Sequence, residues 1–151
     1  MRRGQGVPMD GPLRYSDAVL DHYRNPRNVG EIQGSAAVAQ AGDPATGDVL
    51  KISLRIQNGV VEEARFKAFG CTAAIAAGSM ATTLLLGRSV EEAARLTNLD
   101  VVRALGGLPD SKIECSVLAE QAIQAALRRH RETLEKERDE ETARCRPSAS
   151  P

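Results

Sequence analysis

The stretch from Ala64 to Leu86 changes its hydrophobic period in the middle, and this change constrains the fold on both sides. Residues 64–68 alternate small or apolar side chains with charged ones, which is the period of a half-buried strand. From Thr72 an alanine-rich run follows, which predicts a buried helix. Cys71 stands at the junction, directly after a glycine that permits a tight turn. The sequence therefore predicts a strand, a turn and a helix, with a thiol at the start of the helix.

A thiol in this position has two interpretations. The N-terminus of a helix offers unpaired backbone N–H groups and a positive dipole end, so a thiol there loses its proton more readily. The thiolate is the form that binds metals and attacks sulfur. The alternative is a small buried cysteine that only fills the junction, because free cysteine is among the most buried residue types. Cys71 alone leaves both interpretations open.

A hairpin is predicted ahead of this thiol. Residues 50–57 alternate apolar and polar side chains. Asn58-Gly59 follows, the strongest short hairpin signal, because both residues tolerate a positive φ. The returning strand is predicted over 60–69, and pairing across the turn joins residues whose numbers sum to about 117. This register places Asp48 opposite Phe69, so the loop that carries Asp48 should lie near the thiol.

Other segments predict helices around this unit. Helix starts are expected at Ser16, at Ser89 with a capping box to Glu92, at Thr97 or Asn98, and at Ser116, and a weak first strand is expected over 35–40. A helix capped by Ser116 would place Cys115 directly before a helix N-terminus, as Cys71 is. Two cysteines in matching positions are harder to explain by packing alone. His22 falls on the first helix, where hydrogen bonding or exposure is the more common role of a histidine.

The composition excludes several classes of function. The 151 residues fit one domain, and the 20 basic and 20 acidic side chains give no net field to attract nucleic acid or an acidic membrane. Two Phe, two Tyr and no Trp offer little for stacking on bases. There is no apolar run of about 18 residues and no signal core, so we expect a cytoplasmic protein without membrane or nucleic-acid partners. Three cysteines form no even disulfide framework, which favours free thiols or metal ligation.

The composition also divides the chain. Residues 1–13 are rich in Gly, Pro and Arg, which predicts a flexible leader. Residues 14–131 are expected to form one α+β domain, a small antiparallel three-stranded sheet with a hairpin, packed against several helices including a long C-terminal one. From 132 to 151 the chain is charged and then rich in Ser and Pro, which predicts a disordered tail after the helix has continued for a few turns with Glu–Lys support. Cys145 lies in this tail and is assigned to no site.

Taken together, these segments resemble the iron–sulfur cluster assembly scaffold family of IscU-like proteins and NifU N-terminal domains. The resemblance covers 14–131 and is carried by Tyr15-Ser16-Asp17, Leu20 to Asn28, Gly47-Asp48-Val49, Phe69-Gly70-Cys71 with Ala74-Ile75-Ala76, and Cys115 to Glu120. It implies that Cys71 and Cys115 bind iron and a nascent 2Fe-2S cluster, and that Asp48 affects how readily the cluster is lost. It also implies a cysteine desulfurase as sulfur donor, apo iron–sulfur proteins as acceptors and, in part of the family, a chaperone.

The chain departs from the family pattern at two ligand positions. Thr46 stands where the family has its first ligand cysteine, and Glu114 stands where a histidine commonly precedes the third. A threonine cannot replace a thiolate, whereas Glu114 can supply a hard oxygen donor. With Asp48, Cys71 and Cys115 this makes two sulfurs and two carboxylates, which suit a single Zn²⁺ or Fe²⁺ about as well as a cluster. The alternative is that Glu114 points into solvent and Thr46 caps its own loop.

Three functions remain open from the sequence. The first is a cluster scaffold or carrier, which is not an enzyme in the ordinary sense, with any cluster weaker and more oxygen-labile than on three cysteines. The second is a degenerate paralogue that binds Zn²⁺ or a desulfurase and regulates. The third is a persulfide relay through Cys115 without a metal, because thiolate attack requires only one activated cysteine. The segment 108–112, Leu-Pro-Asp-Ser-Lys, matches the chaperone-recognition segment of the family only in part.

Overall fold

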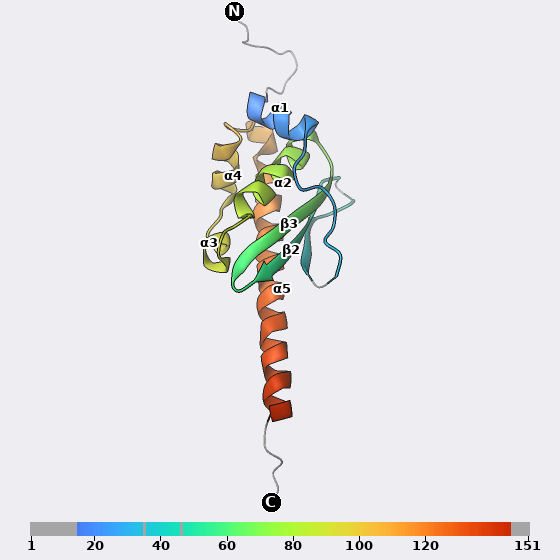
Figure 1. Ribbon diagram of the computed structural model, residues 1–151. Coiled ribbons are helices and arrows are strands. Elements are labelled where there is room, and N and C mark those ends of the chain that lie inside the picture. Colours follow the sequence, from blue (N-terminus) through green and yellow to red (C-terminus); the bar gives the residue numbers. More distant parts are fainter. Residues whose placement is uncertain (1–14, 35, 46, 146–151) are drawn as a thin grey trace, which may run out of the picture.

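The computed structural model describes residues 15–34, 36–45 and 47–145, with residues 144 and 145 described by their backbone alone. It confirms the α+β prediction of a three-stranded antiparallel sheet with several helices, one of them long and C-terminal (Figure 1). The elements in order are α1 (Asp17–Arg24), β1 (Ala37–Gly42), β2 (Val49–Gln57), β3 (Val60–Phe69), α2 (Thr72–Leu85), α3 (Val90–Ala94), α4 (Asn98–Ala104), a 3₁₀ turn (Asp110–Lys112) and α5 (Ile113–Cys145).

The sheet has the strand order β1-β2-β3, and β2 and β3 form the predicted hairpin. Asn58 and Gly59 at its tip have φ values of 54° and 76°, as the turn requires. The predicted register is wrong by one residue, because a bulge between Arg55 and Ile56 shifts the pairing. Phe69 therefore pairs with Val49, and Asp48 lies level with the glycine that precedes Cys71.

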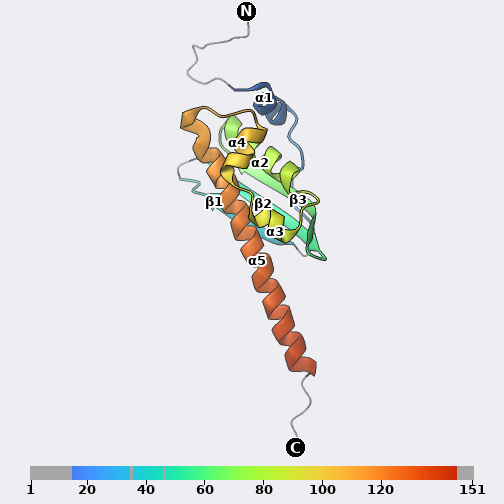
Figure 2. The same ribbon diagram turned by 90° about the vertical axis from the view of Figure 1, so that its left-hand side faces the viewer.

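Two helices cover one face of the sheet. In the core, α2 packs mainly on β3 and α5 mainly on β1, and the two helices also contact each other (Figures 1 and 2). Leu50, Ile52 and Leu54 of β2 and Phe66 of β3 are almost fully buried beneath them. α2 lies so close to the sheet that a Cβ at Gly78 would stand 2.5 Å from the Phe66 ring. This close packing fixes the position of α2 against the sheet.

The first helix is attached to α2 and to α4 by polar side chains. Ser16 caps α1 by accepting the Val19 N–H at 3.0 Å, and its own hydroxyl donates to the Leu105 carbonyl. His22 is buried, and its Nδ1 lies 2.7 Å from Ser79 Oγ of α2. His22 therefore has a hydrogen-bonding role, as predicted. These contacts hold Tyr15, which directly precedes the cap, at the N-terminal end of α2.

Two expectations about the last helix are corrected. α5 begins at Ile113 and not after Ser116, because the 3₁₀ turn Asp110–Lys112 leads straight into it. The Ser116 hydroxyl donates to the Ile113 carbonyl at 2.5 Å within the first turn, so Ser116 is not the N-cap of α5. The helix also continues to Cys145, so the disorder predicted from the composition does not begin within residues 132–145. Oppositely charged side chains four positions apart and good helix formers favour this continuation.

The leader 1–13 and residues 146–151 lie outside the described residues. Within the described part of the chain, none of the helices is both long enough and apolar enough to cross a bilayer.

Candidate metal centre

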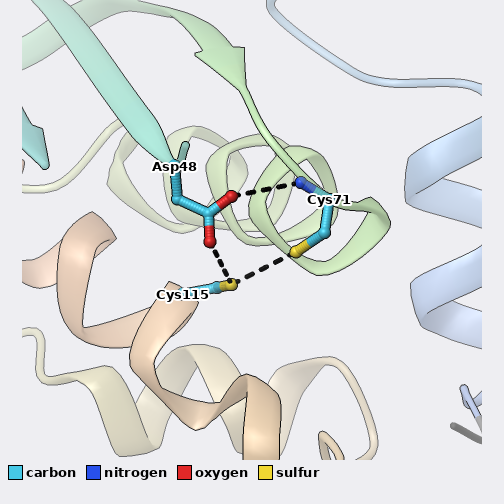
Figure 3. A group of neighbouring side chains, drawn as sticks. All are labelled: Asp48, Cys71 and Cys115. Carbon is cyan, nitrogen blue, oxygen red and sulfur yellow. Dashed lines mark hydrogen bonds between the residues drawn. The ribbon is translucent and has the colours of Figure 1, made fainter. Parts of the chain in front are cut away.

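Three segments that are distant in sequence meet at one end of the sheet (Figure 3). Asp48 directly precedes β2, Cys71 is the N-cap of α2, and Cys115 lies in the first turn of α5. One ligand atom from each side chain can be chosen so that all three lie within 4.8 Å of one another. The predicted convergence of two sulfurs and an aspartate is thus present.

The distances define a small group of donors. The two Sγ atoms lie 3.5 Å apart, and Cys115 Sγ lies 3.8 Å from Asp48 Oδ2. The other carboxylate oxygen, Oδ1, accepts the Cys71 backbone N–H at 3.3 Å. Asp48 is therefore oriented by the helix N-terminus of α2, one of whose unpaired N–H groups it satisfies. Its second oxygen is left facing the sulfurs.

Glycine at position 70 is required for this approach. Gly70 has a φ of +142°, and a Cβ there would stand 2.0 Å from Asp48 Oδ1. A side chain at this position would both strain the backbone and displace the carboxylate. Gly42 permits a similarly close approach on the other side of Asp48, since a Cβ there would stand 2.2 Å from the Asp48 carbonyl oxygen. The backbone on both sides of Asp48 is thus adapted to bring its carboxylate to the cysteines.

The group is closed on its inner side and partly open on its outer side. Cys115 is 3% exposed and packs with Ala73 and Ala74, whereas Asp48 and Cys71 are half-buried. Burial raises the pKa of the Cys115 thiol, and the neighbouring Cys71 and Asp48 raise it further. Burial therefore opposes ionisation of Cys115 in the free protein. A cation bound between the donors would oppose each of these effects, since it favours the thiolate.

Two residues near the sulfurs were not identified as site residues from the sequence. Tyr15 packs against the cluster of Ala73, Ala74 and Cys115, and burial followed by the charge of Cys71 raises the pKa of its hydroxyl. Lys112 lies close enough to Cys71 for the thiolate charge to raise the pKa of its ammonium group. Tyr15 directly precedes a predicted cap and Lys112 lies three positions before Cys115, but these signals alone assign no role.

Glu114, the fourth ligand predicted from the sequence, does not join the group. The side chain of Glu114 is exposed, and Glu114 is not among the three residues whose ligand atoms converge. Thr46, at the position of the family's first ligand cysteine, lies outside the described residues, as does the side chain of Cys145. Of the four ligands predicted from the sequence, the described structure thus brings together Asp48, Cys71 and Cys115.

The donor set fits a thiophilic metal ion. A tetrahedral Zn²⁺ with metal–sulfur bonds of about 2.3 Å holds its two sulfurs about 3.8 Å apart. The separation between Cys71 and Cys115 is 3.5 Å, so both sulfurs need to move only slightly to ligate one ion. Thiolates select Zn²⁺ and iron–sulfur centres, while the Asp48 carboxylate adds a harder donor. Three protein donors leave the fourth position of a tetrahedral ion open.

Comparison with known proteins identifies the family of this chain. The family model described as NifU-like N terminal domain matches residues 14–137. The iron-sulfur cluster assembly scaffold protein IscU of Azotobacter vinelandii is 45% identical over 120 residues, covering 77% of this chain and 93% of the relative. The protein of the same description from Escherichia coli K12 is 44% identical over 119 residues, covering 76% of this chain and 92% of the relative.

The fold is also found among solved structures. The N-terminal part of a NifU-like protein from Brucella abortus aligns with a TM-score of 0.61 at 18% identity, covering 78% of this chain and 94% of that one. This likeness supports the fold alone. The family model covers most of the chain, and the two IscU relatives are closely similar in sequence. The chain therefore belongs to the NifU-like N-terminal domain family.

Proposed function

We propose that this protein is a scaffold or carrier for iron–sulfur cluster assembly. Its substrate would be iron, or iron and sulfide held as a nascent 2Fe-2S cluster. The observation that carries the proposal is the 3.5 Å approach of Cys71 and Cys115, brought together by two helix starts beside Asp48. The names of the IscU relatives, which are called cluster assembly scaffold proteins, support the same function.

Each of the three residues has a distinct role in this proposal. Cys71 and Cys115 supply thiolates, which are the usual ligands of iron–sulfur clusters. Asp48 supplies a carboxylate, a harder donor that exchanges more readily and keeps the product transferable. The protein does not turn over a substrate in the ordinary sense: iron and sulfide enter, and a cluster leaves. We therefore do not class it as an enzyme.

The ligand count makes any cluster labile. A 2Fe-2S cluster has four terminal ligand positions, commonly filled by four thiolates. Cys71, Cys115 and Asp48 fill three of them, and the fourth is left to Glu114 after a side-chain movement or to a thiolate from outside the chain. Sulfur would come from a cysteine desulfurase and the cluster would pass to apo iron–sulfur proteins. We propose no nucleic-acid partner.

Cluster transfer tests the proposal directly. The protein is reconstituted anaerobically with Fe³⁺ and sulfide and mixed with an apo-ferredoxin, whose own spectrum reports acquisition of a cluster. We expect transfer from the loaded protein to be faster than from free iron and sulfide. Replacing Thr46→Cys should stabilise the bound cluster and slow its transfer, because a third thiolate is added. Equal rates with and without the protein would contradict a scaffold or carrier function.

A mononuclear site is a second candidate, favoured by the fit of the two sulfurs to one tetrahedral ion. In that function the protein would hold Zn²⁺ and regulate a cysteine desulfurase. Titration with Zn²⁺ under reducing conditions, followed by a desulfurase assay with the loaded protein, separates this function from cluster assembly. The zinc-loaded protein would then alter desulfurase activity, while the iron-loaded protein would not donate a cluster.

A persulfide relay through Cys115 requires a separate test. The burial of Cys115 and its raised pKa both slow attack by this thiol in the metal-free protein. Incubation with a desulfurase and cysteine, followed by peptide mass measurement, would show whether Cys115 gains one sulfur atom. A relay predicts this adduct without added metal.

A further inference from the structure

The last helix continues well past the folded body. In both views α5 projects beyond the sheet and the other helices (Figures 1 and 2). Every side chain from 131 to 143 is exposed, and the family model ends at residue 137, before the helix does. A single helix that is polar on all sides is stabilised by charge pairs along its own surface or by a partner.

One face of α5 carries an ordered pattern of charge. At 100° per residue, eight side chains lie within about 120° of the helix circumference. This face, which we call the charged stripe, consists of Ala125, Arg128, Arg129, Glu132, Lys136, Asp139, Glu140 and Ala143. Among the described residues, none of its six charged side chains forms an ion pair or a side-chain hydrogen bond. The stripe is thus basic at its start and acidic at its end, and its charges are unpaired.

This pattern is complementary to itself in one orientation. When two copies of the stripe are laid antiparallel, Arg128 of each copy faces Glu140 of the other, and Arg129 faces Asp139. In the same register Glu132 faces Lys136, and the small Ala125 and Ala143 meet at the two ends. A parallel arrangement in register would place like charges together instead. An interface in which the same patch serves both partners is the common form of a symmetric dimer.

We propose that the charged stripe is a docking surface for a second copy of this chain, bound antiparallel along α5. The surface beside the stripe is hollowed. Two shallow grooves of about 330 and 410 Å³ run between α5 and the edge strand β1. Stripe residues line both of them, together with Ala36 to Gln40 of the edge. The partner helix lies along these grooves and covers the outer edge of β1.

The charges set the strength and the salt dependence of this dimer. Exposed ion pairs are individually weak, and they compete with pairs four positions apart in the same helix, such as Arg128 with Glu132. The symmetric dimer makes each of its three kinds of charge pair twice, so their contributions add over the interface. The Debye length falls from about 10 Å at 0.1 M salt to about 3 Å at 1 M, so salt dissociates the dimer.

The dimer leaves the metal-binding group of each copy free. Cys115 lies at the opposite end of α5 from the projecting part. In an antiparallel pair centred near Leu134, a rise of 1.5 Å per residue places the two Cys115 residues about 57 Å apart. Each copy therefore presents its sulfurs at an outer end of the assembly. The proposal is thus independent of the metal or cluster that the site holds.

Charge swapping tests the proposal with the full chain. One variant carries Arg128→Glu and Arg129→Glu, and the other carries Asp139→Lys and Glu140→Lys. Sedimentation equilibrium at several concentrations and at low and high salt measures association, and circular dichroism checks that α5 remains helical. We expect the unaltered protein to dimerise, with at least a tenfold weaker association constant at 1 M than at 0.05 M salt. Each variant alone should be monomeric, because like charges then face each other.

The mixture of the two variants provides the decisive result. An equal mixture should dimerise again, because every pair then joins opposite charges. The matched control, Arg131→Glu with Arg138→Glu, makes the same charge change on another face of α5 and should dimerise as the unaltered protein does. The proposal is overturned if the unaltered protein is monomeric at all concentrations and salts. It is also overturned if each variant alone dimerises normally, or if the mixture stays monomeric.

Discussion

The Sγ atoms of Cys71 and Cys115 lie 3.5 Å apart, although 44 positions separate the two residues in the chain. Neither side chain reaches the other by itself: the N-cap of α2 and the first turn of α5 must be held together. The small, buried Ala73 and Ala74 pack with Cys115 and allow this close approach. The geometry of the site therefore depends on how α2 packs against the sheet and α5, and on the backbone around Asp48.

Gly70→Ala should damage the site more than the fold. The new Cβ would stand 2.0 Å from Asp48 Oδ1 in a backbone with φ of +142°. We expect a loss of about 1–3 kcal/mol in the free energy of unfolding from backbone strain, and at least tenfold weaker Zn²⁺ binding as Asp48 is displaced. Urea unfolding and metal titration measure the two effects.

Gly87→Ala is the matched control for this variant. Gly87 also has a positive φ, +82°, but a Cβ there meets nothing within 4 Å. It should therefore lose stability through strain while keeping its metal affinity. If the two variants bind Zn²⁺ equally well, the contact between Gly70 and Asp48 does not position the carboxylate.

Gly78→Ala should destabilise the protein although alanine is the better helix former. Helix propensity favours the change by about 1 kcal/mol. Against this, the Cβ would stand 2.5 Å from the Phe66 ring and 2.9 Å from Leu50, and overpacking costs about 1–3 kcal/mol. We expect a net loss of about 1 kcal/mol in urea unfolding, reduced when Phe66→Leu is added to make room. A more stable Gly78→Ala protein would show that α2 can move away from the sheet without cost.

Stability should fall as the pH drops below about 6.5, the ordinary pKa of histidine. Burial, and then the charge of Arg27, lower the pKa of His22 in the folded protein. Below about pH 6.5 the His22 side chain therefore binds a proton in the unfolded chain but not in the folded protein, and this one residue contributes a slope of at most about 1.4 kcal/mol per pH unit to the loss of stability. Urea unfolding between pH 7.5 and pH 5.5 measures this slope.

His22→Gln identifies the residue responsible for that slope. The chain has two histidines, and burial lowers the pKa of His130 as well. His22 is 8% exposed and bound to Ser79, whereas His130 lies half-buried on α5. We therefore expect His22→Gln to flatten the slope more than His130→Gln. The opposite order would assign the pH dependence to α5.

Local signals predicted most of the fold. The Asn58-Gly59 turn and the alternating strands on both sides of it define the hairpin, and the Ser89 to Glu92 capping box starts α3 as predicted. These features depend on residues within a few positions of one another. The one-residue register error comes from the bulge after Arg55, which no side-chain pattern indicates.

The sequence predicts which residues form the site, but not how deeply they are buried or how readily they ionise. Motifs pointed to Asp48, Cys71 and Cys115, and hairpin pairing brought the first two close. The deep burial of Cys115, and the raised pKa that follows, depend on the packing of α5 against α2, which spacing in the sequence does not contain. The start of α5 was misplaced because Ser116 is a good capping residue in isolation, yet its hydroxyl donates to the Ile113 carbonyl.

Anaerobic reconstitution with Fe³⁺ and sulfide tests the central claim most directly, with thiolate-to-iron absorption as the measurement. The account predicts absorption in the unaltered protein, its loss in Cys71→Ala and in Cys115→Ala, and its retention in Cys145→Ala, which removes the third cysteine from outside the group. Unchanged absorption in both the Cys71 and the Cys115 variants would contradict the account, because the two sulfurs that the fold brings together would then not hold the iron.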